Sequence, residues 1–142
     1  MRIDLPTDRR DVHTMRIPIR WGDMDAMGHV NNTVYFRYFE SIRIEYLHSI
    51  APPPNANGEG FIVANAFCNY LRQLRYPGEV VATLSIGAVG RTSLETYVTL
   101  ARVDDVEGPF AAGGATVVWV DYRAGRAVAL PEVVQTRLRA VA

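Results

Sequence analysis

Between Asn32 and Ile50 the apolar residues recur at helical spacing, and this stretch sets the strongest limit on the fold. When each residue is turned by about 100° from the last, the large side chains gather within an arc of roughly 120°. They are Tyr35, Tyr38, Phe39, Ile42, Tyr46 and Ile50. The run APPPNANGEG at 51–60 ends the predicted helix, because consecutive prolines cannot continue one. The rest of the chain therefore has to supply a layer that covers one long helix.

Alternating residues before and after this helix predict β-strands. The segment 14–21 alternates as a half-buried strand does, with one side made of Met15, Ile17, Ile19 and Trp21. Pro18 cannot donate a hydrogen bond to a neighbouring strand, so we expect this strand at a sheet edge. Four more strands are expected after the helix, over residues 61–71, 80–89, 93–103 and 111–122, the last with Val117 and Trp119 facing inward.

These elements predict an α+β domain in which a five-stranded antiparallel sheet covers one long helix. Pro131 is expected to be the first residue of a short terminal helix, which has an apolar stripe of Val134, Leu138 and Val141. We expect residues 1–13 to form a flexible lead-in and residues 14–142 to form the single domain. The strand 61–71 is too apolar for a solvent-facing edge, so we expect it to pair with a second copy of the chain.

Composition narrows the classes of function. The 15 basic and 15 acidic side chains cancel, whereas a protein that binds nucleic acid normally has a basic excess. No run approaches the ~18 apolar residues of a membrane span, and the polar segment 1–15 does not resemble a secretory signal. We therefore expect a cytoplasmic protein. The spacing of His, Cys, Asp and Glu predicts no metal site.

The loop GDMDAMGHVNN at 22–32 carries the candidate chemistry. Asn31 or Asn32 can cap the helix, because an asparagine side chain accepts hydrogen bonds from the first N–H groups. Those N–H groups and the helix dipole also form a natural anion site. Asp25 precedes Asn32 by seven residues, so the loop is long enough to fold back over the helix start. Gly28 is expected to adopt a turn conformation that other residues resist.

The run WGDMDAMGHVNNTVY, from Trp21 to Tyr35, resembles the signature of the 4-hydroxybenzoyl-CoA thioesterase-like branch of hotdog proteins. It is also similar to a segment of plant acyl-ACP thioesterases, and the resemblance extends from about residue 14 to the end. It implies the hotdog fold, a five-stranded antiparallel sheet wrapped around one long central helix, in homodimers or dimers of dimers. It further implies hydrolysis of an acyl-CoA thioester, with no cofactor beyond the coenzyme A of the substrate.

This resemblance also assigns roles within the loop. Asp25 takes the position of the catalytic carboxylate, whereas Asp23 is expected to bond nearby backbone N–H groups. Asp25 could attack the thioester directly or activate a water molecule, and both routes remain open. The backbone N–H of Asn32 takes the position that polarises the substrate carbonyl. His29 could orient the carboxylate, act as a base or be a polar loop residue.

Further contacts with the substrate are expected from Gly28, Asn31 and Tyr35, the last of which is close enough to the helix start to line an acyl pocket. Arg91, Thr92 and Ser93 lie at a turn that in this family contacts the nucleotide and phosphates of coenzyme A, often from the neighbouring subunit. An arginine suits such phosphates. Cys68 is expected to be a buried thiol without a catalytic role.

Three other functions remain open at this point. The thioester carrier could be an acyl carrier protein in place of coenzyme A, or the same fold could bind an acyl-CoA without hydrolysing it. A pure assembly domain is the third alternative, although such a domain would not need the loop 22–32.

Overall fold

A computed structural model describes residues 1–53 and 55–141 of the chain. Strand β1 (Arg10–Pro18) and the short 3-10 helix η1 (Trp21–Asp23) precede the long helix α1 (Asn32–Ile50). Four strands follow: β2 (Glu59–Tyr70), β3 (Glu79–Val89), β4 (Ser93–Arg102) and β5 (Ala111–Asp121). The two-residue strand β6 (Arg126–Ala127) and helix α2 (Glu132–Ala140) complete the described chain.

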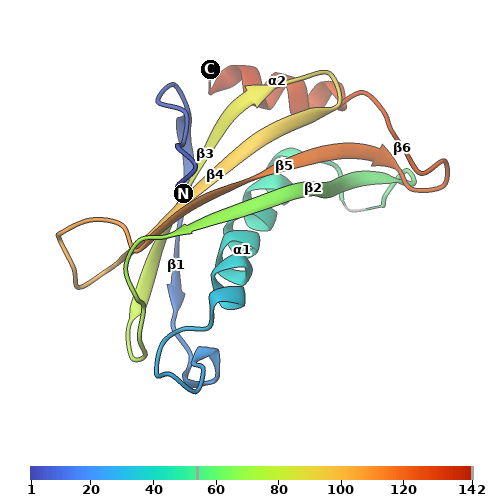
Figure 1. The fold of residues 1–142 in the computed structure, drawn as a ribbon. Helices are drawn as coiled ribbons and strands as arrows, with labels where there is room; N and C mark the ends of the chain where they lie inside the picture. Colours follow the sequence, from blue (N-terminus) through green and yellow to red (C-terminus); the bar gives the residue numbers. More distant parts are fainter. Residues whose placement is uncertain (54, 142) are drawn as a thin grey trace.

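The strands form one antiparallel sheet in the order β1-β3-β4-β5-β2, with β6 paired to the end of β5. Figure 1 shows the long strands curving along one side of α1, with α2 at the far end of the sheet. The α+β class and the antiparallel sheet are confirmed. The expected sheet of five strands lacks the two-residue β6, which pairs with the end of β5. The short terminal helix is confirmed as α2, although Pro131 is its N-cap and not its first residue.

The core lies between α1 and the concave face of the sheet. All six residues of the predicted helical arc are buried, and the facing strands contribute fully buried side chains such as Leu84, Leu100 and Val117. The inward orientation of Val117 and Trp119 is confirmed. Gly113 of β5 allows the Phe39 ring to approach the sheet, since a side chain there would occupy the space of that ring.

The first strand differs from its prediction at both ends. It begins at Arg10 rather than at Thr14, and the Asn69 side chain exchanges two hydrogen bonds with the backbone of Ile3, at 3.0 and 2.7 Å. It ends at Pro18, so the alternation does not extend to Trp21, which lies in η1 with 77% of its surface exposed. The edge position expected from Pro18 is confirmed.

Strand β2 is the other edge of the sheet, because within the described chain it pairs only with β5. It is 12 residues long, and Ile62 and Val63 near its middle are 44% and 47% exposed. A long apolar edge of this kind offers unpaired backbone groups to another strand. No helix in the described part of the chain is long and apolar enough to cross a membrane.

The close approach of the Phe39 ring to Gly113 predicts that a larger residue at position 113 lowers the stability of the fold. A β-carbon at this position would overlap the carbonyl oxygen of Phe67 and lie 2.6 Å from the Phe39 ring. We therefore expect Gly113→Ala to destabilise the fold by about 1–3 kcal/mol through overpacking. Urea unfolding measures this change, and Gly22→Ala is the control because a β-carbon at Gly22 meets no atom within 4 Å. Equal stability of the two variants would contradict this account of the core.

Candidate active site

The loop before α1 is held by its own backbone. The Asp25 N–H donates to the His29 carbonyl at 2.8 Å, and the Gly28 N–H donates back to the Asp25 carbonyl at 3.1 Å. Gly28 closes this turn with a φ of 79°, a conformation that glycine adopts without strain. The Asn31 N–H donates to the carbonyl of Asp23 at 2.9 Å, which brings the loop back to the start of α1.

The two loop aspartates have different surroundings. Asp23 Oδ2 accepts from the Arg20 N–H at 2.9 Å and from the Tyr38 hydroxyl at 2.6 Å, so this carboxylate is engaged in holding the loop to α1. Burial, followed by the hydrogen bond to Asp23, raises the pKa of Tyr38. Asp25 uses only Oδ1, which accepts from the Met27 N–H at 2.9 Å and from the His29 N–H at 3.5 Å. Its Oδ2 has no hydrogen-bond partner in the described chain.

The first turn of α1 leaves one N–H group free. Asn31 is the N-cap, and its Oδ1 accepts from the Thr33 N–H at 2.9 Å. The Asn31 carbonyl accepts from the Val34 N–H at 2.9 Å. No such partner exists for the Asn32 N–H among residues 1–53 and 55–141. The helix start therefore presents an unpaired donor where the helix dipole favours negative charge.

Asp25 and Asn32 line the same cleft, which has a volume of about 520 Å³ and is called here the Asp25 cleft. Its other lining residues include Met27, His29, Tyr35, Tyr70 and Leu71. The rings of Tyr35 and Tyr70 meet edge to face with centroids 4.9 Å apart. The Tyr70 hydroxyl donates to the Asn32 carbonyl at 2.7 Å, and the Tyr35 hydroxyl accepts from the Leu74 N–H at 3.1 Å. These two tyrosines form an aromatic wall beside the helix start.

Tyr70 is a cleft residue that the sequence analysis did not identify. It is the last residue of β2, and its side chain lies on the same side of the sheet as α1. Burial raises its pKa to about 12, so the hydroxyl keeps its proton at neutral pH. The alternation along β2 was the available signal, but the distance from Tyr70 to Asn32 depends on the packing of α1 against the sheet.

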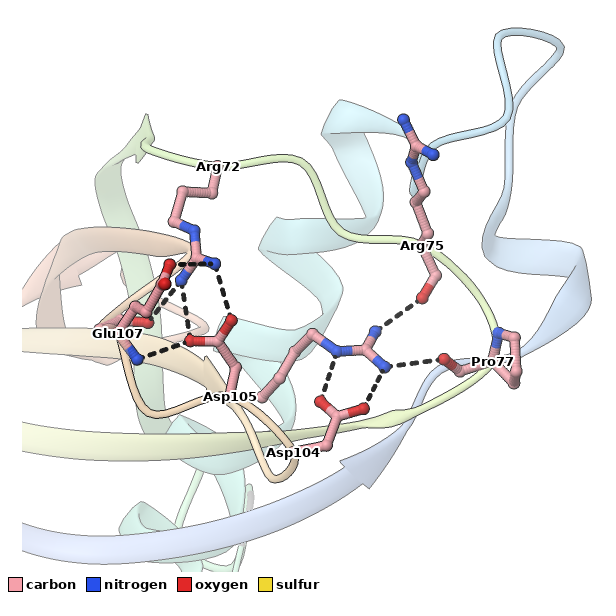
Figure 2. A network of polar contacts seen from close by, with 8 residues as sticks. Arg72, Arg75, Pro77, Asp104, Asp105 and Glu107 are labelled. Atoms are coloured by element: carbon pink, nitrogen blue, oxygen red, sulfur yellow. Dashed lines mark hydrogen bonds and ion pairs between the residues drawn. The ribbon is translucent and has the colours of Figure 1, made fainter.

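The connection between β2 and β3 forms the opposite side of the cleft. The N–H groups of Leu71 and Arg72 both donate to the Phe110 carbonyl at 3.0 Å, and the Val30 N–H donates to the Leu74 carbonyl at 2.9 Å. The Arg72 guanidinium binds both carboxylate oxygens of Asp105, at 2.7 and 3.0 Å (Figure 2). This connection is thereby fastened both to the loop before α1 and to the turn between β4 and β5.

Arg102 adds a second set of contacts to the same connection. It pairs with Asp104 at 2.8 and 3.0 Å and donates to the carbonyls of Arg75 and Pro77 at 2.8 and 2.9 Å. Figure 2 shows the Arg75 guanidinium pointing away from this network. Its Nη2 instead donates to His29 Nε2 at 3.2 Å. Because a guanidinium can only donate, His29 Nε2 is the acceptor in this contact.

The predicted site residues do not all meet within one chain. Asp25, His29, Asn32 and Tyr35 line the cleft, with Gly28 and Asn31 next to them in the loop and at the helix cap. The turn 91–93 lies at the far end of β3, where the carbonyls of Arg91 and Thr92 accept from Leu130 and Trp119. This turn therefore does not line the Asp25 cleft of its own chain.

Cys68 has the character expected of a structural thiol. It is half buried against the core, and burial raises its pKa to about 11. A thiol with a raised pKa is a poor nucleophile at neutral pH. Within residues 1–53 and 55–141, no three His, Cys, Asp or Glu side chains form a group that could hold a metal ion.

The pairing of Arg72 with Asp105 predicts a pH-dependent stability. The hydrogen bond from Arg72 lowers the pKa of Asp105 from 3.8 to about 2. A folded pKa below the ordinary value means that the charged carboxylate favours the folded state, fully above pH 3.8 and progressively less as the pH falls toward 2. We expect Asp105→Asn to lower the Tm at pH 7, and we expect its difference from the parent to shrink as the pH falls from about 4 to about 2. Asp4→Asn, at an exposed residue, is the control, and a difference that does not change with pH would contradict this pairing.

Comparison with known proteins places this arrangement in a family. The model of the thioesterase-like superfamily matches residues 19–138. The uncharacterized protein YsmA of Bacillus subtilis strain 168 is 31% identical over 114 residues, which cover 80% of this chain and 76% of YsmA. The PA2801 protein of Pseudomonas aeruginosa, described as a candidate thioesterase, is 33% identical with a TM-score of 0.84, over 91% of this chain and 99% of that one.

A further solved structure is that of a thioesterase from Thermus thermophilus in complex with coenzyme A and zinc. It is 31% identical to this chain with a TM-score of 0.77, and the match covers 89% of this chain and 96% of that one. The family model matches most of the chain, and the two solved structures match its fold over 91% and 89% of its length. The chain therefore belongs to the thioesterase-like superfamily and has its hotdog fold.

Proposed function

We propose that this protein hydrolyses an acyl-CoA thioester to a free acid and coenzyme A, with Asp25 as the catalytic carboxylate. One observation carries the proposal: a carboxylate oxygen and a backbone N–H, both without partners in the described chain, belong to residues that line one cleft. Thioester hydrolysis needs these two groups, an oxygen base or nucleophile and a donor for the developing oxyanion.

The Asn32 N–H is the proposed oxyanion donor. A thioester carbonyl seated at the helix start would accept a hydrogen bond from it, and the helix dipole adds to the effect. The donor is fixed by the helix and has no competing partner to give up when the oxyanion forms. One such donor typically lowers the barrier by about 3 kcal/mol.

Asp25 then acts in one of two ways. As a general base it removes a proton from water, the water oxygen bonds to the acyl carbon, and the carbon–sulfur bond breaks with the electron pair on sulfur. As a nucleophile its Oδ2 bonds to the acyl carbon, and the carbon–sulfur bond breaks with the electron pair on the sulfur of coenzyme A. Water then cleaves the resulting anhydride, which releases the free acid and restores the Asp25 carboxylate. Both routes need an ionised carboxylate with one oxygen held and one free. Asp25 fits that need, because the Met27 and His29 N–H groups hold Oδ1.

Coenzyme A is the proposed carrier, and the Thermus thermophilus thioesterase bound to coenzyme A supports it. Arg72 is not expected to bind the phosphates, since Asp105 and Glu107 already neutralise its charge. Arg91 of a second copy remains the proposed phosphate contact, together with Thr92 and Ser93. Arg91 is exposed at its turn and has no ion pair in the described chain. A homodimer is therefore part of this proposal.

Asp25→Asn tests the carboxylate. The amide can neither attack nor take a proton, so we expect the release of free CoA thiol to fall by about 100- to 10,000-fold. The assay follows thiol release from acyl-CoAs of short, medium and long chain and from aromatic acyl-CoAs. Asp4→Asn is the matched control with the same chemical change at an exposed residue. Thiol release by Asp25→Asn at the parent's rate would rule out the proposed role.

Asn32→Pro tests the oxyanion donor without removing the helix. Proline lacks the N–H but is favoured at the first position of a helix, and Asn31 already has the φ of −57° and ψ of 139° that suit a residue before proline. We expect kcat to fall by roughly 100- to 1,000-fold with little change in Tm. Asn32→Ala keeps the N–H and should lose less than about ten-fold. If both variants lose activity equally, the side chain and not the N–H is responsible.

A further inference from the structure

Tyr70 connects the end of an edge strand to the residue that carries the proposed oxyanion donor. Its hydroxyl donates to the Asn32 carbonyl at 2.7 Å, across 38 positions of sequence. Among residues 1–53 and 55–141, Tyr70 is the one residue outside α1 that hydrogen-bonds to the backbone of Asn32. The sheet thus contacts the first residue of the helix directly, through a single side chain.

The other contacts at the start of α1 hold the neighbours of Asn32. The Asn31 N–H donates to the Asp23 carbonyl at 2.9 Å, and Asn31 Oδ1 accepts from the Thr33 N–H at 2.9 Å. The first N–H groups of a helix have no partners within the helix, and helix ends open at a low cost in free energy. The hydrogen bond from Tyr70 therefore restrains the one residue of this turn that the cap leaves free.

The Tyr70 side chain is itself held in place. Its ring meets that of Tyr35 edge to face, with centroids 4.9 Å apart. Tyr35 is only 3% exposed, and its hydroxyl accepts from the Leu74 N–H at 3.1 Å. A chain of contacts therefore runs from the connection between β2 and β3, through the two tyrosine rings, to the start of α1.

A fixed position matters more for an oxyanion donor than for most backbone groups. The donor stabilises the transition state only if it is already about 2.7–3.1 Å from the place where the charge develops. A misplacement of about 1 Å can lower the rate on the order of 100-fold. A hydrogen bond that holds the Asn32 carbonyl also restrains the orientation of the N–H of the same residue.

We propose that Tyr70 is a positioning residue, whose hydroxyl holds the first residue of α1 so that the Asn32 N–H is aimed at the thioester carbonyl. This inference rests on the proposed hydrolase function and adds the group that keeps its oxyanion donor in place. Because the oxyanion forms only in the transition state, Tyr70 acts on kcat and not on KM. Tyr70 also lines the Asp25 cleft, so the test must separate this role from a direct contact with the substrate.

Tyr70→Phe removes the hydroxyl and keeps the ring. We expect kcat for thiol release from acyl-CoA to fall by about 10- to 100-fold, with KM changed less than about two-fold. Tyr122→Phe is the matched control, because the Tyr122 hydroxyl also donates to a strand carbonyl, that of Phe61 at 3.3 Å. The two tyrosines are 45% and 44% exposed. Tyr122→Phe should keep the parent's kcat, and thermal unfolding checks that both variants are folded.

A double variant separates positioning from contact with the substrate. In Asn32→Pro the donor is absent, so its position no longer affects the rate. Adding Tyr70→Phe to Asn32→Pro should therefore lower kcat by less than about two-fold further, since effects that act through one group are not additive. A tyrosine that contacted the substrate directly would cause its full loss in this background as well.

Relaxation of the Asn32 amide nitrogen, measured by NMR, reports on the helix start without any substrate. A rigid backbone has an order parameter of about 0.85, and a flexible one falls below about 0.6. We expect Asn32 to be rigid in the parent and in Tyr122→Phe. In Tyr70→Phe its order parameter should fall, whereas that of Ile42 in the middle of α1 should not change.

The outcomes separate this proposal from the proposed function. Support consists of a kcat loss in Tyr70→Phe that disappears in the Asn32→Pro background, together with the lower order parameter. A parent-like kcat in Tyr70→Phe, the same loss in both backgrounds or an unchanged order parameter overturns the positioning role and leaves the hydrolase intact. A folded parent that releases no thiol from any acyl-CoA overturns the hydrolase function, and with it the catalytic role of Tyr70.

Discussion

Burial of the apolar face of α1 against a curved sheet dictates where the two ends of this helix lie. Tyr35, Phe39, Ile42 and Leu47 are removed from water by the strands, and this apolar contact is the main source of stability for a domain of this size. The helix axis is then held along the sheet, and its first turn emerges beside the end of β2. The N-terminus of α1, with the free Asn32 N–H and a favourable dipole, is thereby placed next to the end of β2 and the loop 22–31.

In the loop before α1, the two aspartates Asp23 and Asp25 have different hydrogen-bond partners. Asp23 is engaged by the Arg20 N–H and the Tyr38 hydroxyl and holds the loop to the helix. Asp25 is held by one oxygen only. Asp23 and Asp25 have the same carboxylate group. An oxygen that accepts hydrogen bonds from the protein is less available to a substrate or a water molecule, so the two carboxylates differ in what they can do. The Asn31 cap has the same effect on the helix, since it engages the neighbouring N–H groups and leaves that of Asn32.

Hydrogen bonds and ion pairs with the protein also limit what the arginines around the cleft can bind. Arg72 and Arg102 lie close to the active-site loop, yet Asp105 and Asp104 neutralise them and they fasten the connection between β2 and β3 (Figure 2). This fastening keeps the wall of the cleft at a fixed distance from α1. Strand β2 leaves one edge without a partner strand in the described chain. The functional unit that we propose is accordingly larger than one chain.

The sequence by itself determined the elements and the candidate loop. The helical spacing of Tyr35, Phe39 and Tyr46, the prolines after Ile50 and the asparagines before Thr33 predicted α1 to within a residue. These signals are local, because periodicity and capping depend on residues within one or two turns. The tertiary structure decided which groups remain without partners. Tyr70 beside Asn32, Arg72 on Asp105, the exposure of Trp21 and the burial of Arg43 each depend on contacts between distant segments, and no local pattern encodes such contacts. The reactivity that we propose depends on which polar groups those contacts leave free, and for that reason the fold was needed to find them.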